Sequence, residues 1–450
     1  MEQVRYLIIG AGPTGLGAGV RLRQLGIEDF LLLERHDYAG GLSASFRDAA
    51  GFTWDIGGHV VFSRLEPFLR LLDQALGEDA FTHQRRARVR LADRWIPYPF
   101  QNNIRHLPKE LVWECVQGLL ASRLAPQEAA HFGQWMEAVF GAGITRLFMQ
   151  PYNFKVWATP AEAMDFRWIG ERVAVVDLAD VLRRIILEED ATDWGPNAVF
   201  RFPKHGGTGA IFRRIAEGIA EHIRYQAPVH QVDWENKIVT YGDGHCVGYG
   251  DLLTTMPLDL FVSQVMHPKT PHLVEAARLL EHNGVCVSGI GIAGLREDPT
   301  CWMYFPESNC PFYRVTNFHN YSPFNVAEPG KQMAFMSETS FSRHKPENLD
   351  ALEGAVIQGL QNVTLMHAED TVVTRWEHRV DYGYPVPTLG RDRALATIQP
   401  WLEARHIFSR GRFGGWKYEV ANMDHSVVQG MQWAERMVLG TAEQIYQLPQ

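Results

Sequence analysis

The chain has 450 residues, of which 46% are hydrophobic and 21% are charged. This composition is that of an ordinary globular protein and excludes an intrinsically disordered chain. With 43 basic and 52 acidic residues the formal net charge is −9, which argues against nucleic acid or an anionic membrane as a partner. The length predicts two or three domains.

Five cysteines are spread along the chain without a C-x-x-C pair. This spacing predicts neither a disulfide framework nor a metal site, and it fits a reducing compartment. The first residues lack the pattern of a signal peptide, and no run reaches the roughly 18 uninterrupted apolar residues of a membrane span. We therefore expect a cytoplasmic protein with no membrane span and no bound metal.

A βαβ unit is predicted at the start of the chain, with strands at 6–9 and 30–33 and a helix at 16–25. The glycine fingerprint of dinucleotide-binding folds lies between the first strand and the helix, and Glu34 ends the second strand 19 residues after the last motif glycine. The glycines, Gly10, Gly12 and Gly15, allow a tight turn and a close approach of pyrophosphate to the helix N-terminus. Glu34 can accept a hydrogen bond from a ribose hydroxyl.

A second G-x-G-x-x-G at 289–294 is not expected to bind a nucleotide. It follows an alternating segment at 285–288, and no helix is predicted after it. We predict a half-buried strand rich in small residues. A flavin reductase with two nucleotide sites is therefore disfavoured.

Four further segments resemble the FAD-binding domain of the amine oxidase superfamily. They are the glycine pair within 40–44, residues 229–232 with the hairpin that follows, 252–257, and 407–413 leading to a helix near 427–437. Their scatter implies FAD, not NAD, and a discontinuous domain. Aromatic residues grouped with Asn, Gln and Arg in loops, as at 95–100, 152–157 and 302–305, favour a pocket for a flat or hydroxylated ligand.

The expected class is α/β. A discontinuous Rossmann-like FAD-binding domain covers 1–95, 201–260 and 387–450. A mainly helical domain at 96–200 and a strand-rich, mixed-sheet substrate domain at 261–386 are inserted into it.

Longer blocks extend over nearly the whole chain: 57–63, 95–104, 147–157, 169–174, 194–203, 301–314, 382–389 and 409–426. On these blocks the chain resembles the UDP-galactopyranose mutases, the eukaryotic type more than the bacterial. The resemblance implies an isomerase that interconverts UDP-galactopyranose and UDP-galactofuranose with no net redox change. It implies that N5 of reduced FAD attacks the anomeric carbon to form a covalent adduct, with NADPH or NADH as possible reductant. The oligomeric state stays open.

The resemblance also implies roles for single residues. Arg172 and Arg314 clamp the diphosphate of the nucleotide sugar, where a bidentate guanidinium suits phosphate, and with His59 they form the catalytic set. A structural ion pair, for example of Arg172 with Glu171, is the alternative. The implied substrate contacts are Tyr98 and Phe148 on the two faces of uracil, Gln101 at its edge, and Asn153, Trp157, Asn197, Trp302, Tyr304, Tyr384 and Tyr418 around the diphosphate and sugar. Core packing is the alternative for these residues.

On the cofactor side, His59 follows two glycines that permit close approach to the isoalloxazine ring. The residues expected to contact FAD are Gly10, Gly12, Thr14, Gly15, Glu34, Arg35, Gly41, Leu42, Ser43, Gly58, His59, Val229, Gly411, Arg412, Asn422, Met423 and Ser426.

Three other functions remain open at this stage. A flavin-dependent amine oxidase shares the FAD domain but predicts an apolar cage without an arginine pair. An inactive protein that binds a nucleotide sugar predicts losses at flavin or sugar positions. A mutase of the same mechanism acting on a different nucleotide sugar fits the blocks equally well apart from the uracil contacts.

Overall fold

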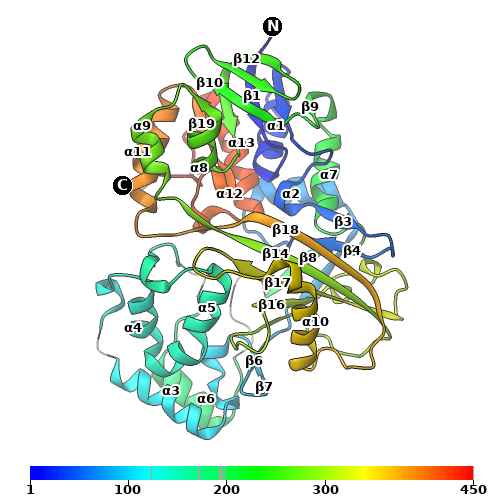
Figure 1. Ribbon diagram of the computed structural model, residues 1–450, viewed down its shortest axis with the longest axis vertical. Helices are drawn as coiled ribbons and strands as arrows, with labels where there is room; N and C mark the ends of the chain where they lie inside the picture. The colour runs from blue at the N-terminus through cyan, green and yellow to red at the C-terminus, as the bar shows by residue number, and fades with distance from the viewer. Residues whose placement is uncertain (123, 171–172, 192–194, 196–197, 449–450) are drawn as a thin grey trace.

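The computed structural model describes residues 1–122, 124–170, 173–191, 195 and 198–448. It confirms the predicted α/β class, with two large sheets and a separate group of helices. We name three parts: the upper lobe around the sheet that contains β1 (Glu2–Ile9), the helical lobe from α3 (Lys109–Ala121) to α6 (Leu178–Leu187), and the strand lobe around the sheet that contains β14 (Glu281–Ala293). Figure 1 shows the upper lobe at the top, the helical lobe at lower left and the strand lobe at lower right.

The sheet of the upper lobe has eight strands in the order β13-β10-β11-β12-β1-β2-β9, with β19 paired beside β12. β1 pairs in parallel with both β2 and β12, which is the arrangement of a βαβ fold. The strands are β1 (Glu2–Ile9), β2 (Phe30–Leu33), β9 (Ile223–Arg224), β10 (Val229–Asp233), β11 (Ile238–Tyr241), β12 (His245–Thr254), β13 (Met266–His267) and β19 (Ile407–Ser409).

Helices cover both faces of this sheet because β1 is apolar on both. Tyr6 and Ile8 point to one face and Leu7 and Ile9 to the other, and all four are buried. The first face packs against α1 (Pro13–Gln24), α2 (Glu66–Leu76), α7 (Gly209–Glu217) and α13 (Met423–Leu439). The second packs against α8 (Leu258–Leu260), α9 (Pro271–Ala277), α11 (Arg391–Glu403) and α12 (Gly411–Gly414). The predicted strand, helix and strand at 6–33 and the helix near 427–437 are thus confirmed.

The sheet of the strand lobe has seven strands in the order β18-β14-β17-β16-β15-β6-β7. The strand predicted around 289–294 lies in β14, but it is buried and not half-buried, because β17 and β18 flank it and side chains cover both faces. The elements are β6 (Ala87–Leu91), β7 (Arg94–Pro97), β14 (Glu281–Ala293), β15 (Trp302–Tyr304), β16 (Arg314–Asn317), β17 (Gln332–Phe341), β18 (Val372–Val386) and the covering helix α10 (Leu352–Asn362).

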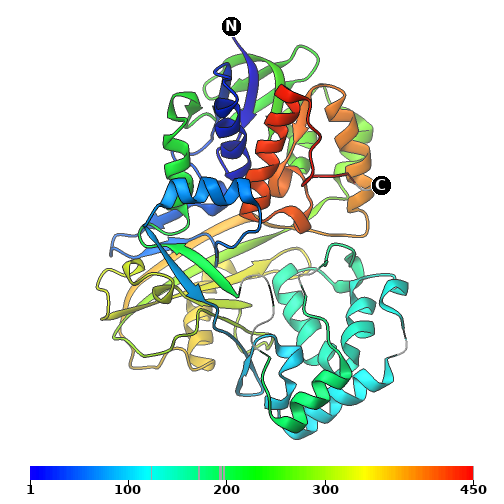
Figure 2. The same cartoon turned by 180° about the vertical axis from the view of Figure 1, so that it is seen from behind.

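Two small sheets join the lobes, and the predicted domain boundaries stay predictions. β6 and β7 extend across the boundary expected at residue 95 and pair in the seven-stranded sheet. Figure 2 shows the helical lobe from behind, beside the strand lobe and below the upper lobe. The small sheets pair β3 (Ser45–Arg47) with β4 (Thr53–Asp55) and β5 (Ala80–Gln84) with β8 (Val199–Pro203), and the helical lobe contains α3 (Lys109–Ala121), α4 (Phe132–Ile144), α5 (Gln150–Trp157) and α6 (Leu178–Leu187).

Asp55, at the end of β4, is fully buried and gives a first prediction. Its carboxylate accepts hydrogen bonds from the Ser45 hydroxyl and from the backbone N–H of Thr208 at 3.2 and 3.3 Å. Burial raises the pKa of Asp55 from 3.8 to about 6, against the opposing hydrogen bonds. The native state therefore holds this proton at pH values where the unfolded chain releases it, so this contribution to stability is lost as pH rises from about 4 to above 6.

A pKa difference of about two units is worth about 3 kcal/mol. We expect the free energy of unfolding of the wild type, relative to Asp55→Asn, to fall by about that amount between pH 4 and pH 7. Urea unfolding of both proteins at several pH values measures this difference. If the difference in unfolding free energy between the two proteins does not change with pH, the raised pKa of Asp55 is contradicted.

Candidate active site

The loop between β1 and α1 forms the turn that the glycine fingerprint predicts. Gly10 has a φ of +103°, which L side chains rarely adopt, and a Cβ there would meet Thr255 Oγ1 at 2.2 Å. α1 begins at Pro13 without a side-chain cap. Its first N–H groups therefore have no partner within the helix and, with the positive end of the helix dipole, they form a site for an anion.

Glu34 lies beside this loop and is 5% exposed. Its Oε2 accepts from the backbone N–H of Ala11 at 2.7 Å, and its Oε1 accepts from that of His36 at 2.9 Å. Each carboxylate oxygen has a second lone pair, so Glu34 can still accept from a ribose hydroxyl.

Two segments far away in the sequence meet the same loop. A Cβ added to Gly41 would lie 3.3 Å from the Cα of Gly12, and one added to Gly411 would lie 2.5 Å from Thr14 Oγ1. α13, which follows residues 411–422, packs along α1. The structure thus gathers the glycine loop, 41–43 and 411–426 at the carboxyl end of the first sheet, where open α/β sheets bind their ligands.

His59 lies next to Gly58, which bonds to Glu338 of the strand lobe, and its buried Nδ1 has no hydrogen-bond partner among the described residues. Burial lowers the pKa of His59 to about 4; the Glu338 carboxylate opposes this effect, and the charges of Arg314 and Arg412 reinforce it. The imidazole is therefore neutral at pH 7. A buried, unpaired ring nitrogen next to two glycines is the kind of group that a bound cofactor or substrate completes.

Arg314 is held by the buried carboxylate of Glu338. The two residues face each other across β16 and β17, with Nε–Oε1 and Nη2–Oε2 distances of 2.7 Å. Tyr313 donates its hydroxyl to Oε2 at 2.7 Å, and the Gly58 N–H donates to Oε1 at 2.9 Å. Burial alone would raise the pKa of Glu338, but the Arg314 charge and these hydrogen bonds hold it below its usual range.

This carboxylate joins two parts of the site. Glu338 is 2% exposed, and through Gly58 it fixes the loop of His59 in place beside Arg314. The pair uses Nε and Nη2 of Arg314, and in the part of the chain that the structure describes Nη1 has no hydrogen-bond partner. Arg314 is therefore ion-paired and still has a nitrogen to offer to an anion.

Aromatic rings from the helical and strand lobes face each other next to Arg314. Tyr304 contacts Tyr98 and Tyr152 at centroid distances of 5.1 and 5.4 Å, and Tyr152 stacks on Phe148 at 5.2 Å. The Trp302 indole N–H donates to the Tyr304 hydroxyl at 2.7 Å. Burial raises the pKa of Tyr98, Tyr152 and Tyr304, so these phenols are neutral hydrogen-bonding groups at pH 7.

A second aromatic group includes Arg412. Trp157 contacts Tyr384 at 5.7 Å and Tyr418 at 4.9 Å, while the Arg412 guanidinium lies 4.9 Å from the ring of Tyr384 and 5.6 Å from that of Tyr418. The hydroxyls of Tyr384 and Tyr313 are 3.4 Å apart. The second group is thereby linked to Glu338, so one network extends from the loop of His59 to the helical lobe.

α5 carries Tyr152 and Trp157 and is anchored to the strand lobe by buried polar groups. The ammonium of Lys155, 8% exposed, donates to the backbone oxygens of Glu307 and Cys310 at 2.9 Å. The Asn283 amide donates to the backbone oxygen of Val156 at 2.8 Å. These hydrogen bonds hold α5 of the helical lobe in place beside Tyr304 and Tyr384 of the strand lobe.

Comparisons with known proteins agree with this geometry. The sequence model of the flavin-containing amine oxidoreductases matches residues 13–436. A crystal structure described as reduced UDP-galactopyranose mutase superposes with a TM-score of 0.95 at 40% identity, covering 98% of this chain and 95% of that one. The chain belongs to the flavin-containing amine oxidoreductases and, within them, to the UDP-galactopyranose mutases.

More distant relatives of this mutase chain share less. Amine oxidase A of Canis lupus familiaris is 26% identical over 247 residues, covering 50% of the chain and 44% of the relative. A Baeyer-Villiger monooxygenase of Streptomyces coelicolor is 46% identical over 61 residues, 13% of the chain and 11% of the relative. The chain thus matches less than half the length of these two curated relatives. A structure described as a putative protoporphyrinogen oxidase, at 18% identity and a TM-score of 0.74, shares the fold.

FAD is the cofactor of this family, and the described residues fit it. The glycine loop and the first turn of α1 would hold the pyrophosphate, Glu34 a ribose, and the neutral, unpaired Nδ1 of His59 would face the flavin side. The individual FAD contacts of the mutase chain stay predictions.

The predicted substrate residues differ in where they lie. Gln101 is buried; its amide donates to the backbone oxygen of Ala174 at 2.7 Å and its Oε1 has no partner among the described residues, which suits an edge-reading role. Asn153 instead bonds to the backbone oxygen of Met149 at 2.7 Å and lines a groove of about 480 Å³ between α4 and α5. Arg172 and Asn197 lie outside the described residues.

Three functional candidates were missed by the sequence reasoning: Tyr152, Tyr313 and Glu338. Tyr152 stands inside a block that carries the family resemblance, next to Asn153, which was chosen. Glu338 had a signal of its own, since an acidic residue in the middle of a buried strand requires a partner.

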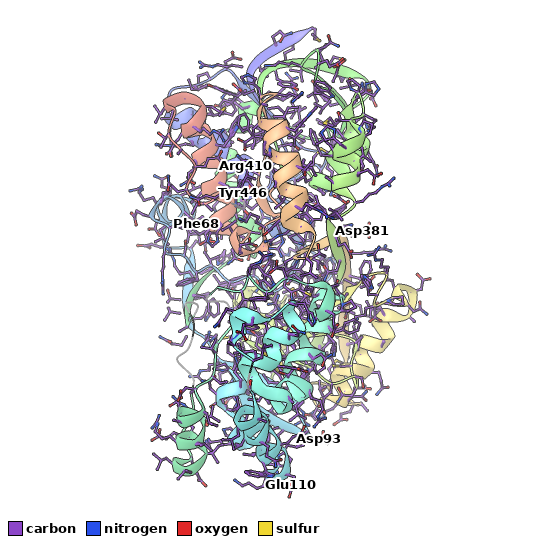
Figure 3. All side chains as sticks on the ribbon, turned by 90° about the vertical axis from the view of Figure 1, so that its left-hand side faces the viewer. Phe68, Asp93, Glu110, Asp381, Arg410 and Tyr446 are labelled. Carbon is purple, nitrogen blue, oxygen red and sulfur yellow. The ribbon has the colours of Figure 1, made fainter. Side chains whose placement is uncertain are left out.

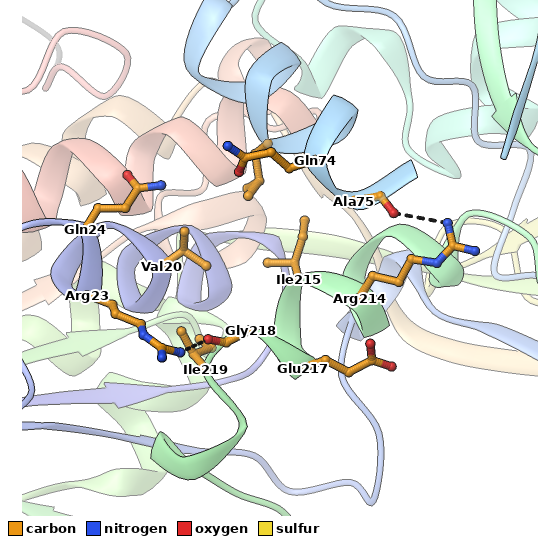
Figure 4. Close-up of a pocket in the computed structure, with 11 residues that line it drawn as sticks. Val20, Arg23, Gln24, Gln74, Ala75, Arg214, Ile215, Glu217, Gly218 and Ile219 are labelled. Atoms are coloured by element: carbon orange, nitrogen blue, oxygen red, sulfur yellow. Dashed lines mark hydrogen bonds between the residues drawn. The ribbon is translucent and has the colours of Figure 1, made fainter. Parts of the chain in front are cut away.

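An open cavity of about 580 Å³ lies elsewhere, on the outer side of the upper lobe between α1, α2 and α7 (Figure 4). Its arginines are already engaged: Arg23 donates to the backbone oxygen of Gly218, and Arg214 donates to that of Ala75 at 3.1 Å and to Asp79 at 2.5 Å. None of the buried polar atoms that lack a partner belongs to a residue lining this cavity. It is not a candidate for the reaction site.

All five cysteines have free thiols. Nowhere in the described ranges do three or more His, Cys, Asp or Glu side chains gather as a metal would require. No helix in those ranges has the length and apolar character to span a membrane.

Proposed function

We propose that this chain interconverts UDP-galactopyranose and UDP-galactofuranose with reduced FAD and no net redox change. The observation that carries the proposal is the Arg314–Glu338 pair. Its guanidinium lies close enough to Tyr152, Tyr304 and Tyr384 for its charge to act on their phenols, and Glu338 ties it to the loop of His59. An arginine among aromatic rings fits a nucleotide diphosphate better than it fits an amine.

Each group then has a task. Arg314, with Arg172, binds the diphosphate and stays bound to it when it leaves the sugar. The aromatic rings position the uracil and the sugar and keep water out, and their protonated phenols donate to sugar or phosphate oxygens. Reduced FAD, when bound, supplies the nucleophile through N5. The neutral His59 is placed to accept or donate one hydrogen bond on the flavin side.

A direct test is anaerobic incubation of dithionite-reduced protein with UDP-galactofuranose, followed by chromatography. Formation of UDP-galactopyranose supports the proposal. Turnover of a different nucleotide sugar with no turnover of the galactose forms would support the narrower alternative of a changed substrate. Peroxide production from amines in air would support an oxidase.

We further expect activity to require reduced flavin while consuming no reductant per turnover. The reason is that the sugar enters and leaves at the same oxidation level, so the electrons return to the flavin. The measurement is the number of turnovers per flavin after one stoichiometric reduction under anaerobic conditions. Full activity of the oxidised enzyme, or one NADPH or NADH consumed per product, contradicts it.

We also propose a cytoplasmic location, since the five free thiols and the family's dependence on a reduced flavin suit a reducing compartment. Cell fractionation with an antibody to the chain tests this location.

A further inference from the structure

Residues 441–448, which follow α13, pack against the segment that carries Gly411 and Arg412. Figure 3 labels Arg410 and Tyr446 next to each other in the upper lobe, while Asp93 and Glu110 lie at the opposite end of the molecule. Arg410 is 1% exposed and Tyr446 is 4% exposed. Most of residues 441–448 are exposed or half-buried, but the ring of Tyr446 is buried and the side chain of Glu443 is 3% exposed, so these two side chains attach the segment to the upper lobe.

The first attachment is a closed ring of two arginines and two glutamates. Arg410 binds Glu443 through Nε at 2.6 Å and Nη2 at 2.8 Å, and it binds Glu403 at 2.6 Å. Arg436 of α13 completes the ring, at 2.9 Å from each glutamate. The charges balance, and only Glu443 comes from the 441–448 segment, so this segment supplies half of the negative charge that the two arginines need.

The second attachment acts on the glycine-rich backbone itself. Tyr446 donates its hydroxyl to the backbone oxygen of Gly415 at 3.0 Å, and its ring lies 4.4 Å from the Arg410 guanidinium. Arg410 also donates to the backbone oxygen of Ser409 at 3.0 Å. Lys417 donates to the backbone oxygen of Gln447 at 2.9 Å.

These contacts matter because residues 411–415 contain three glycines. Glycine loses more conformational freedom on ordering than any other residue, so such a segment is ordered only when its backbone groups are bound from outside. Gln429 accepts from the Gly411 N–H at 2.9 Å, and Gln399 donates to the backbone oxygens of Ser409 and Gly414. The carbonyl of Gly411 accepts from the Gly415 N–H at 2.8 Å, and the 441–448 segment binds the third glycine carbonyl, that of Gly415.

We propose that the 441–448 segment is a strap that holds residues 409–417 in the conformation that binds FAD, with Glu443 and Tyr446 as positioning residues. The inference rests on the proposed flavin contacts of Gly411 and Arg412 and not on the sugar reaction. Direct binding of FAD therefore tests it separately from mutase activity.

The experiment is fluorescence titration of the FAD-free full-length protein with FAD. Glu443→Gln leaves one glutamate, the half-buried Glu403, for two arginines and is expected to weaken FAD binding about tenfold or more. Tyr446→Phe removes one hydroxyl and keeps the ring, so a loss of about three- to tenfold is expected, as for one neutral hydrogen bond. Glu435→Gln, which removes the half-exposed ion pair between α13 and Arg21 in the last turn of α1, is the control and leaves the affinity unchanged.

Melting temperatures distinguish a strap from general stabilisation. If the strap acts on the FAD-binding conformation, the variants lower the melting temperature of the FAD-bound protein more than that of the FAD-free protein. Equal losses in both forms, or wild-type FAD affinity in Tyr446→Phe, overturn the proposal. Tyr446→Phe carries the test alone if Glu443→Gln does not fold, since deleting one oxygen leaves the packing intact.

Discussion

Replacing Glu338 by glutamine is expected to lower kcat/KM at least a hundredfold. The substitution keeps the size of the side chain but removes the charge that holds Arg314, and it places an amide donor where four donors already converge. Breaking a buried, hydrogen-bonded ion pair costs about 3–5 kcal/mol. Part of this free energy lowers the stability of the protein. The remainder lowers kcat/KM, by about tenfold per 1.36 kcal/mol, because Arg314 and the loop of His59 are misplaced.

Asp370→Asn is a matched control in the same lobe. Asp370 is also shielded from solvent, with its side chain 10% exposed, and it binds Arg296 in a bidentate pair at 2.7 and 3.0 Å. Its loss should lower the melting temperature and leave kcat/KM of the folded protein unchanged. If the two variants lose stability equally and Glu338→Gln retains wild-type kcat/KM, the carboxylate has only a structural role. Steady-state kinetics and thermal melts of both proteins decide the question.

The sequence predicts those features whose signals are local. Residues 6–34 contain a strand, a glycine turn, a helix and a second strand within 29 residues. Glycines mark the turn between the first strand and the helix, and Glu34 marks the end of the second strand. The structure brings residues of the blocks that include Trp157, Tyr304 and Arg314 into one candidate site, and their roles in substrate binding stay predictions.

What the sequence does not predict depends on pairing between segments. The partnership of Arg314 with Glu338 follows from the register of β16 and β17, and no local pattern states that register. The boundary expected at residue 95 stays a prediction; β6, on its N-terminal side, joins the strand lobe by pairing with β15, a partner far away in the sequence. Asn153 stands in one of these blocks, but its amide donates to the backbone oxygen of Met149 one helical turn earlier, and its contact with the substrate stays a prediction.

The second large effect is expected from the two arginines that are proposed to hold the diphosphate. Arg314→Lys keeps a positive charge beside Glu338 but loses the planar guanidinium group. UDP should therefore bind roughly ten- to a hundredfold more weakly, which corresponds to one lost charge-assisted hydrogen bond of about 1.5–3 kcal/mol. Lysine is preferred to alanine here because alanine would leave the buried Glu338 carboxylate without a partner. Arg172→Ala, outside the described residues, should weaken UDP binding by a similar factor.

FAD content should not change in either variant, because the glycine loop at Gly10 and not these arginines is placed to bind the flavin pyrophosphate. Arg296→Lys removes the guanidinium group from the bidentate pair with Asp370 and serves as the control. This variant should bind UDP like the wild type. UDP titration, flavin absorbance and thermal melts of the three variants separate the possibilities. Lower melting temperature with wild-type UDP affinity would assign Arg314 to the structural ion pair alone, whereas weaker UDP binding with unchanged flavin places its free nitrogen on the diphosphate.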